Sequence, residues 1–286
     1  MDFGKLHPSR AVFVVVRNRI GSWDPLMFSF LVVNALLVAT TAYLLFRMAR
    51  EILPEGSVAL LAASLYLLNF AIANVHLAAL VDAAEACLLM AVVASMFYQR
   101  WYLLPLWGVL GALAKESFIP FSISMLLGWW IASCERSRRL AIWIATVAGA
   151  EVSTFVIVHW AVSGHPVSPW AVAASMQSPT PYLNNLWNSL VDRNSWYILM
   201  WLLPLGLAGM KRMLREWKAA AAIGSLAAIV VNAYHSTVGG GGGGLGRYMF
   251  NIAGPLLSVA AAGFLARAEK SSEEMTAEAR HLAGRS

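Results

Sequence analysis

The chain has 286 residues, of which 59% are hydrophobic and only 13% are charged, and its mean hydropathy is +0.63. A soluble domain of average composition carries about 25% charged residues, so this composition excludes that class and predicts an integral membrane protein. The apolar runs are continuous and lack the alternation of an outer-membrane barrel. We therefore expect an all-α, polytopic transmembrane helical bundle. The net charge of +6 comes mostly from short loops between apolar runs, so it is read as an orientation signal and no nucleic-acid partner is expected.

The apolar runs predict about nine spans in a transmembrane domain covering residues 1–267. Residues 1–23 lack the features of a secretory signal and are read as an exported interfacial segment. The spans are expected at about 26–46, 57–75, 77–98, 102–114, 118–132, 140–162, 196–209, 219–234 and 248–266. Between the sixth and seventh lies an exported loop, 163–195, rich in Pro, Asn and aromatic residues. Residues 268–286 form a polar cytoplasmic tail.

The apolar stretch 103–130 is interrupted in its middle by Lys115, Glu116 and Ser117. As one helix it would be about 42 Å long, against a hydrocarbon core of about 30 Å. A Lys at the centre of a span also costs about 2.5–3.5 kcal/mol. We therefore predict a hairpin of two short spans, with Lys115 and Glu116 at a water interface and Pro120 just beyond.

The distribution of Lys and Arg residues predicts how the spans are oriented across the membrane. Most of the 21 Lys and Arg residues fall on one side if the spans alternate as divided. This basic set comprises Arg47, Arg50, Arg100, Arg136, Arg138, Arg139, Lys211, Arg212, Arg215, Lys218, Arg267, Lys270, Arg280 and Arg285. The richer side is expected to be cytoplasmic, which places Asp82, Lys115 and Arg247 on the exported face.

Several short motifs resemble, in their order, the GT-C superfamily of membrane glycosyltransferases, in particular its protein mannosyltransferase and aminoarabinose transferase branch. His7 and Pro8 stand where that branch has a turn before an interfacial helix. Asp82 resembles the acidic residue that opens a later span, and "GVLGALAKESFIPF", with Lys115, resembles a Gly-rich span ending in Lys. "GRYMFNIAGPLLSVAAAG", with Arg247 and Tyr248, resembles the late Arg-Tyr span.

The resemblance implies transfer of a sugar from a polyprenyl-phosphate carrier to a lipid, glycan or protein acceptor at the exported face, in a bacterial inner membrane. One feature departs from the family: the paired acidic motif that follows its first span has no counterpart, and Asp2 is a poor substitute. We therefore expect that an upstream span is absent from this chain and that the form at hand is truncated or inactive. A non-catalytic scaffold or lipid-binding subunit is the alternative function, and a transporter is the third.

Inverting transfer needs a carboxylate to take the acceptor proton and cations to hold the departing phosphate. Asp82 and Glu85, three residues apart on one helical face, are the candidate catalytic residues, as base or as contacts to a divalent metal. The alternative is that they only bond a neighbouring helix end.

The candidate substrate-binding residues are the cations and their sequence neighbours. They are Lys115, Glu116, Arg247, Tyr248 and His7. Lys115 and Arg247 are expected to contact the phosphate, or alternatively to be interfacial anchors. Glu116 is expected to neutralise Lys115. Histidine spacing gives no metal site and no cofactor is assigned, with a divalent metal as the alternative.

Overall fold

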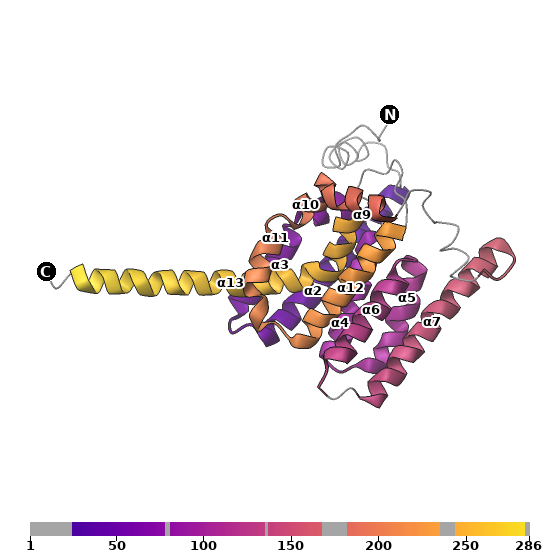
Figure 1. Ribbon diagram of the computed structural model, residues 1–286, viewed down its shortest axis with the longest axis horizontal. Helices are drawn as coiled ribbons and strands as arrows, with labels where there is room; N and C mark the ends of the chain where they lie inside the picture. Colours follow the sequence, from indigo (N-terminus) through magenta and orange to yellow (C-terminus); the bar gives the residue numbers. More distant parts are fainter. Residues whose placement is uncertain (1–24, 78–80, 135–136, 168–181, 235–243, 284–286) are drawn as a thin grey trace.

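The computed structural model describes residues 25–77, 81–134, 137–167, 182–234 and 244–283 (Figure 1). Within these ranges every regular element is helical, and no strand occurs. The predicted all-α class is therefore confirmed. The exported segment 1–23, with His7, lies outside the described residues.

The described ranges contain eleven α-helices and three short π- or 3₁₀-helices. In chain order the elements are α2 (Pro25–Ile52), α3 (Gly56–Leu67), η2 (Ile72–His76), α4 (Asp82–Phe97), η3 (Trp101–Leu103), α5 (Leu104–Ala114), α6 (Phe118–Ala132), α7 (Arg138–Ser163), α9 (Tyr182–Val191), α10 (Arg193–Leu199), α11 (Leu202–Gly209), η4 (Met210–Arg212), α12 (Arg215–Tyr234) and α13 (Gly244–Ala283).

Four helices in the described ranges are long and apolar enough to cross a membrane. They are α2 over Phe28–Ile52, α7, α12 and the part of α13 over Gly244–Glu269. The segments Gly56–Leu67, Trp101–Ala114 and Phe118–Ala132 are apolar but shorter. At a rise of 1.5 Å per residue, each of these three segments is shorter than a hydrocarbon core of about 30 Å.

The predicted break at Lys115 is confirmed, because α5 ends at Ala114 and α6 begins at Phe118. Lys115 has extended backbone angles (φ −165°, ψ 136°), so the helix stops there. Pro120 lies in the first turn of α6, where its missing N–H leaves no intrahelical bond unmade. A side chain at Gly111 would overlap the ring of Phe118, so this glycine lets the hairpin fold back on itself.

Two helices continue past the ends of the spans predicted for them, since hydropathy marks the edge of an apolar run and a helix can continue past it. Helix α2 continues to Ile52, six residues past the predicted end, because Arg47 and Arg50 are good helix formers although they are charged. Helix α13 continues through the polar tail to Ala283. The predicted span 57–75 instead ends as α3 at Leu67, and a π-helix then covers Ile72–His76.

The predicted seventh span and the exported loop also differ in detail. The span is divided into α10 and α11, which are separated by two residues. Part of the predicted loop 163–195 forms the amphipathic helix α9, with Leu183 and Trp187 exposed. Tyr182 stacks on Tyr234 at the end of α12, with ring centroids 5.7 Å apart. This helix therefore caps one end of the bundle (Figure 1).

Small residues bring the central helices into close contact. A side chain at Gly128 of α6 would lie 2.6 Å from the backbone oxygen of Ala219, close to the first turn of α12. Gly209 of α11 lies just as tightly against Ala260 of α13. Glycines at such crossings let backbones pack closely, which is how helices associate when lipid surrounds them. These contacts fix α13 in the middle of the bundle, where its Val259–Ala262 stretch is fully buried.

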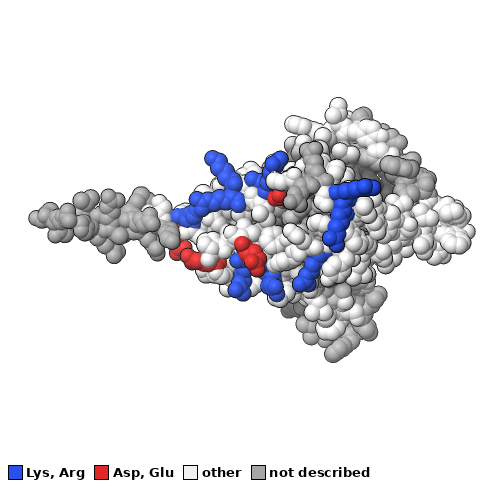
Figure 2. All heavy atoms as spheres, turned by 90° about the horizontal axis from the view of Figure 1, so that it is seen from below, with Lys and Arg blue, Asp and Glu red and all other residues white. Residues whose placement is uncertain are grey.

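The cations gather at one end of the bundle, which we call the basic end. Here Arg47 of α2 lies beside Tyr98, the residue after α4. Gly263 of α13 packs against Leu53, just after α2. Figure 2 shows this face, with Lys and Arg side chains around the point where α13 leaves the bundle. The described cations here are Arg47, Arg50, Arg100, Arg138, Arg139, Lys211, Arg212, Arg215, Lys218 and Arg267.

Candidate functional site

Four charged residues from three parts of the chain meet at the opposite end of the bundle. Asp82 and Glu85 occupy the first turn of α4, Lys115 follows α5, and Arg247 lies in the first turn of α13. We call these four residues the charged cluster. Since α4 has 16 residues, the cluster lies about 24 Å from the basic end.

Hydrogen-bonded ion pairs hold the charged cluster together. Lys115 Nζ donates to Asp82 Oδ1 at 2.7 Å and to Glu85 Oε2 at 3.0 Å. Arg247 Nη1 donates to Asp82 Oδ2 at the longer distance of 3.3 Å. Two carboxylates face two cations, so the buried charge balances, which is the condition under which a membrane-embedded bundle tolerates such groups.

Glu85 is fully buried and both of its oxygens are occupied. Ser117 Oγ donates to Oε1, while Lys115 Nζ and Asn251 Nδ2 (2.8 Å) donate to Oε2. A carboxylate with three donors is held rigidly, because moving any one of them leaves a buried polar group unpaired. Glu85 therefore orients Lys115 and the start of α6.

His76 extends this network behind Glu85. Its Nε2 lies 2.9 Å from Asn251 Oδ1, and because an amide oxygen only accepts, the ring nitrogen carries the hydrogen. Nδ1 of the same ring is buried with no partner in the described part of the chain. The ring also packs on Phe250, with centroids 5.7 Å apart. The π-helix at Ile72–His76 thus brings an imidazole into contact with α13.

The aromatic ring of Tyr248 contacts both cations of the charged cluster. Lys115 Nζ lies 4.8 Å and Arg247 Cζ 5.7 Å from the centre of its ring. Phe121 of α6 packs edge-on against the same ring at 5.1 Å. The negative face of an aromatic ring attracts cations, so Tyr248 helps to keep two positive groups side by side.

The cations of the charged cluster are more exposed than its acids. The side chains of Lys115 and Arg247 are 17% and 25% exposed, whereas that of Asp82 is 2% exposed. Burial opposes the charged form of Lys115, but the carboxylates of Glu85 and Asp82 outweigh it and raise its pKa. Lys115 therefore stays protonated at neutral pH, and a group arriving from outside meets positive charge first.

The structure brings together five of the seven residues expected from the sequence: Asp82, Glu85, Lys115, Arg247 and Tyr248. Ser117, His76 and Asn251 join them, although sequence reasoning gave them no site role. The spacing of Asn251, four residues after Arg247, carried the signal, since residues at that spacing share a helix face.

The expectation that Glu116 neutralises Lys115 is wrong. Glu116 Oε1 lies 3.1 Å from Nε2 of His159 on α7, and its side chain is 47% exposed. Consecutive side chains on extended backbone point in opposite directions, so the extended Lys115 turns inward and Glu116 outward.

A metal site finds no support in the described ranges, where no three His, Cys, Asp or Glu side chains are placed to hold an ion together. Glu151 of α7 is also fully buried, but it lies apart from the cluster and bonds to Ser122 of α6 at 2.6 Å. Comparison of this chain with protein-family models, curated proteins and solved structures found no match.

Proposed function

We propose that this protein is a polytopic membrane glycosyltransferase of the GT-C kind, with a core of about nine spans in a bacterial inner membrane. It transfers a sugar from a polyprenyl-phosphate carrier to an acceptor at the exported face. One observation carries this proposal. The partly exposed cations Lys115 and Arg247 both bond to Asp82, at the end of the bundle opposite the basic end. A fixed pair of cations facing a phosphate is what departure of the carrier requires.

In the proposed step, the acceptor hydroxyl attacks the anomeric carbon of the sugar. The bond from that carbon to the carrier phosphate breaks, and the phosphate leaves with the electron pair. Lys115 and Arg247 bind this phosphate through charge-assisted hydrogen bonds. Tyr248, in contact with both cations, keeps them close enough to share it.

Asp82 accepts the proton of the acceptor hydroxyl in this scheme. Its Oδ1 is held by Lys115 at 2.7 Å, but the 3.3 Å contact from Arg247 to Oδ2 is long for a charged hydrogen bond. When Arg247 turns toward the phosphate, Oδ2 is released at the moment when a base is needed. Glu85 positions Lys115 and does not take the proton, because it is fully buried and both of its oxygens already accept hydrogen bonds.

A non-catalytic lipid-binding subunit is the second candidate, and full pairing of the charged cluster favours it. Both carboxylates are already matched by cations. Such a network also serves simply to join α4, α6 and α13. This function predicts binding of a polyprenyl phosphate with no consumption of its sugar.

The test reconstitutes the full chain in liposomes with undecaprenyl phosphate carrying radiolabelled mannose or aminoarabinose. Release of free undecaprenyl phosphate is measured, because any acceptor, water included, produces it. Lys115→Ala and Asp82→Asn are expected to lower the release at least about a hundredfold, as for loss of one charge-stabilising group. Lys115→Arg, which keeps the charge, is expected to retain more activity than Lys115→Ala.

Three outcomes separate the candidates. Carrier release that falls in both variants supports the glycosyltransferase. Carrier that binds and is never consumed by the wild-type protein supports the lipid-binding subunit. Equal release by the wild type and both variants removes Lys115 and Asp82 from the reaction and overturns the proposed site.

A further inference from the structure

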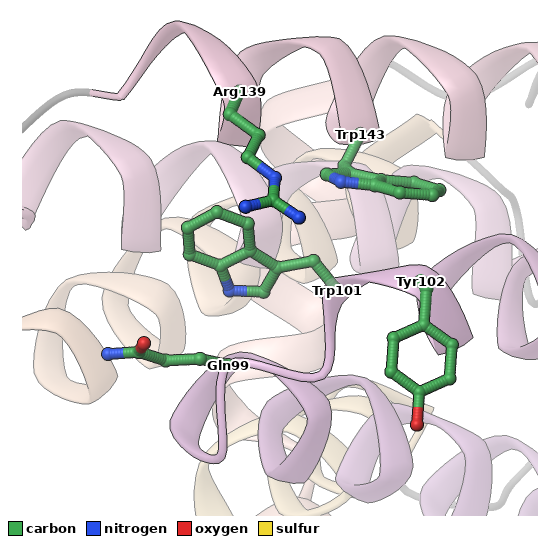
Figure 3. A pocket seen from close by; sticks show the side chains of 5 residues that line it. All are labelled: Gln99, Trp101, Tyr102, Arg139 and Trp143. Atoms are coloured by element: carbon green, nitrogen blue, oxygen red, sulfur yellow. The ribbon is translucent and has the colours of Figure 1, made fainter.

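A cavity of about 110 Å³ opens at the basic end, remote from the charged cluster. Its five lining residues are Gln99, Trp101, Tyr102, Arg139 and Trp143 (Figure 3). Trp101 precedes α5 and Lys115 follows it, so the 11 residues of α5, about 16 Å, separate the two places. The cavity therefore belongs to neither the proposed reaction nor its carrier site.

Arg139 supplies the positive charge of this cavity. Its Cζ lies 5.7 Å from the centre of the Trp101 ring, and Trp143 follows one turn later on the same face of α7. Figure 3 shows the guanidinium between the two indole rings, with the hydroxyl of Tyr102 pointing away. Arg139 is exposed and has no acidic partner in the part of the chain that the structure describes. Its donors are thus available to a ligand.

The size of the cavity limits what it accepts. Pockets for whole small molecules measure about 300–1,000 Å³, so 110 Å³ accommodates one small group and excludes a nucleotide sugar. Guanidinium binds phosphate with two parallel hydrogen bonds, and indole N–H groups are further donors. The guanidinium of Arg139 therefore gives this cavity the donors that a phosphate ester needs.

The surroundings indicate which phosphate ester is presented there. Trp and Tyr concentrate at the depth of lipid headgroups, and the basic end is the side expected to face the cytoplasm. The leaflet on that side carries the anionic lipids that basic pockets bind. We propose that the cavity binds the phosphodiester headgroup of an anionic phospholipid such as phosphatidylglycerol, with Arg139 as its main contact.

The backbone beside the cavity supports a built site. Gln99 has φ +56°, the only positive φ among the described residues other than glycine. Arg100 N–H bonds to Ser95 O at 2.8 Å and Gln99 N–H to Met96 O at 3.2 Å, which is the Schellman arrangement that ends a helix. Glycine fits that position most easily, whereas here the position is occupied by Gln99, which lines the cavity.

The test uses the full chain in mild detergent, titrated with short-chain phosphatidylglycerol, and counts bound lipid by native mass spectrometry. Arg139→Gln is expected to weaken binding about fivefold or more, as for one basic residue at a membrane surface. Arg50→Gln is the matched control, because Arg50 is also an exposed Arg of the basic end, 5.9 Å from the Phe46 ring, and does not line this cavity. It is expected to change binding less than twofold.

Competition experiments and further variants identify the source of the phosphate group. Phosphatidylcholine and inorganic phosphate at millimolar concentration are expected to leave bound phosphatidylglycerol unchanged. Displacement by inorganic phosphate alone overturns the lipid assignment. Equal weakening by Arg139→Gln and Arg50→Gln overturns the site, since it indicates surface charge only. Arg139→Lys, which keeps the charge without the planar fork, is expected to bind between the wild type and Arg139→Gln, and gel filtration checks that each variant is folded.

Discussion

Cations at the two ends of this bundle are in opposite surroundings. In the charged cluster, Lys115 and Arg247 face buried carboxylates and are largely covered. At the basic end, Arg139 and Arg50 are exposed and lie over aromatic rings, and neither forms an ion pair with an acid in the described part of the chain. Lys and Arg side chains therefore have different roles at the two ends of the bundle. Removing a partner is costly in the cluster, whereas at the basic end a substitution changes binding and leaves the fold in place.

Loss of Glu85 is expected to give the largest effect. Glu85→Ala leaves the buried Asn251 amide without its acceptor and removes one of the two carboxylates paired with Lys115, and breaking a buried ion pair costs about 3–5 kcal/mol. The free energy of unfolding in mixed micelles is the measurement. Glu116→Ala, whose half-exposed carboxylate meets only His159, is the matched control, with an expected loss below about 1 kcal/mol. Equal losses in the two variants would contradict the rigid role given to Glu85.

Coupling within the charged cluster is the next largest effect. Because Lys115 and Glu85 are partners at 3.0 Å, the double variant Lys115→Met/Glu85→Gln is expected to lose less stability than the two single variants added together. A coupling of about 1–3 kcal/mol is usual for residues in one network. The four unfolding free energies of this cycle measure it. Strict additivity would mean that the pair contributes nothing to the bundle.

The sequence predicted the hairpin at Lys115 and the meeting of Asp82, Lys115 and Arg247 at one end. Both follow from local quantities, namely the length of an apolar run and the alternation of spans. It could not predict that Lys115 turns to Glu85 while Glu116 turns away, because that depends on one extended residue at the end of α5.

The role of His76 was equally hidden from the sequence. The contact between His76 and Asn251 joins residues 175 positions apart. His76 ends a π-helix that no local sequence pattern predicted. Helix boundaries failed for a related reason. Hydropathy registers where lipid contact ends, whereas the backbone bonds of α2 and α13 continue into polar sequence.

At the basic end, relief of backbone strain is expected to give a smaller, stabilising effect. A side chain in the left-handed region costs about 1–2 kcal/mol, part of which glycine loses again through its freer unfolded chain. Gln99→Gly is therefore expected to raise the free energy of unfolding by about 0.5–1 kcal/mol. Gln99→Ala, which keeps the strain, serves as control and is expected to change stability little. A destabilised Gln99→Gly would show that the amide holds the loop before α5.

The smallest effect sharpens the comparison between two arginines. Arg139→Gln removes an exposed cation over Trp101, worth about 0.5–1 kcal/mol at most, so unfolding should change by about 0.5 kcal/mol or less. Arg247→Gln leaves Asp82 with one cation instead of two, and because Arg247 is partly exposed the expected loss is about 1 kcal/mol. Unfolding in mixed micelles measures both. If Arg139→Gln proves the more damaging, the basic end is held together by its cations, and the contrast between the two ends is wrong.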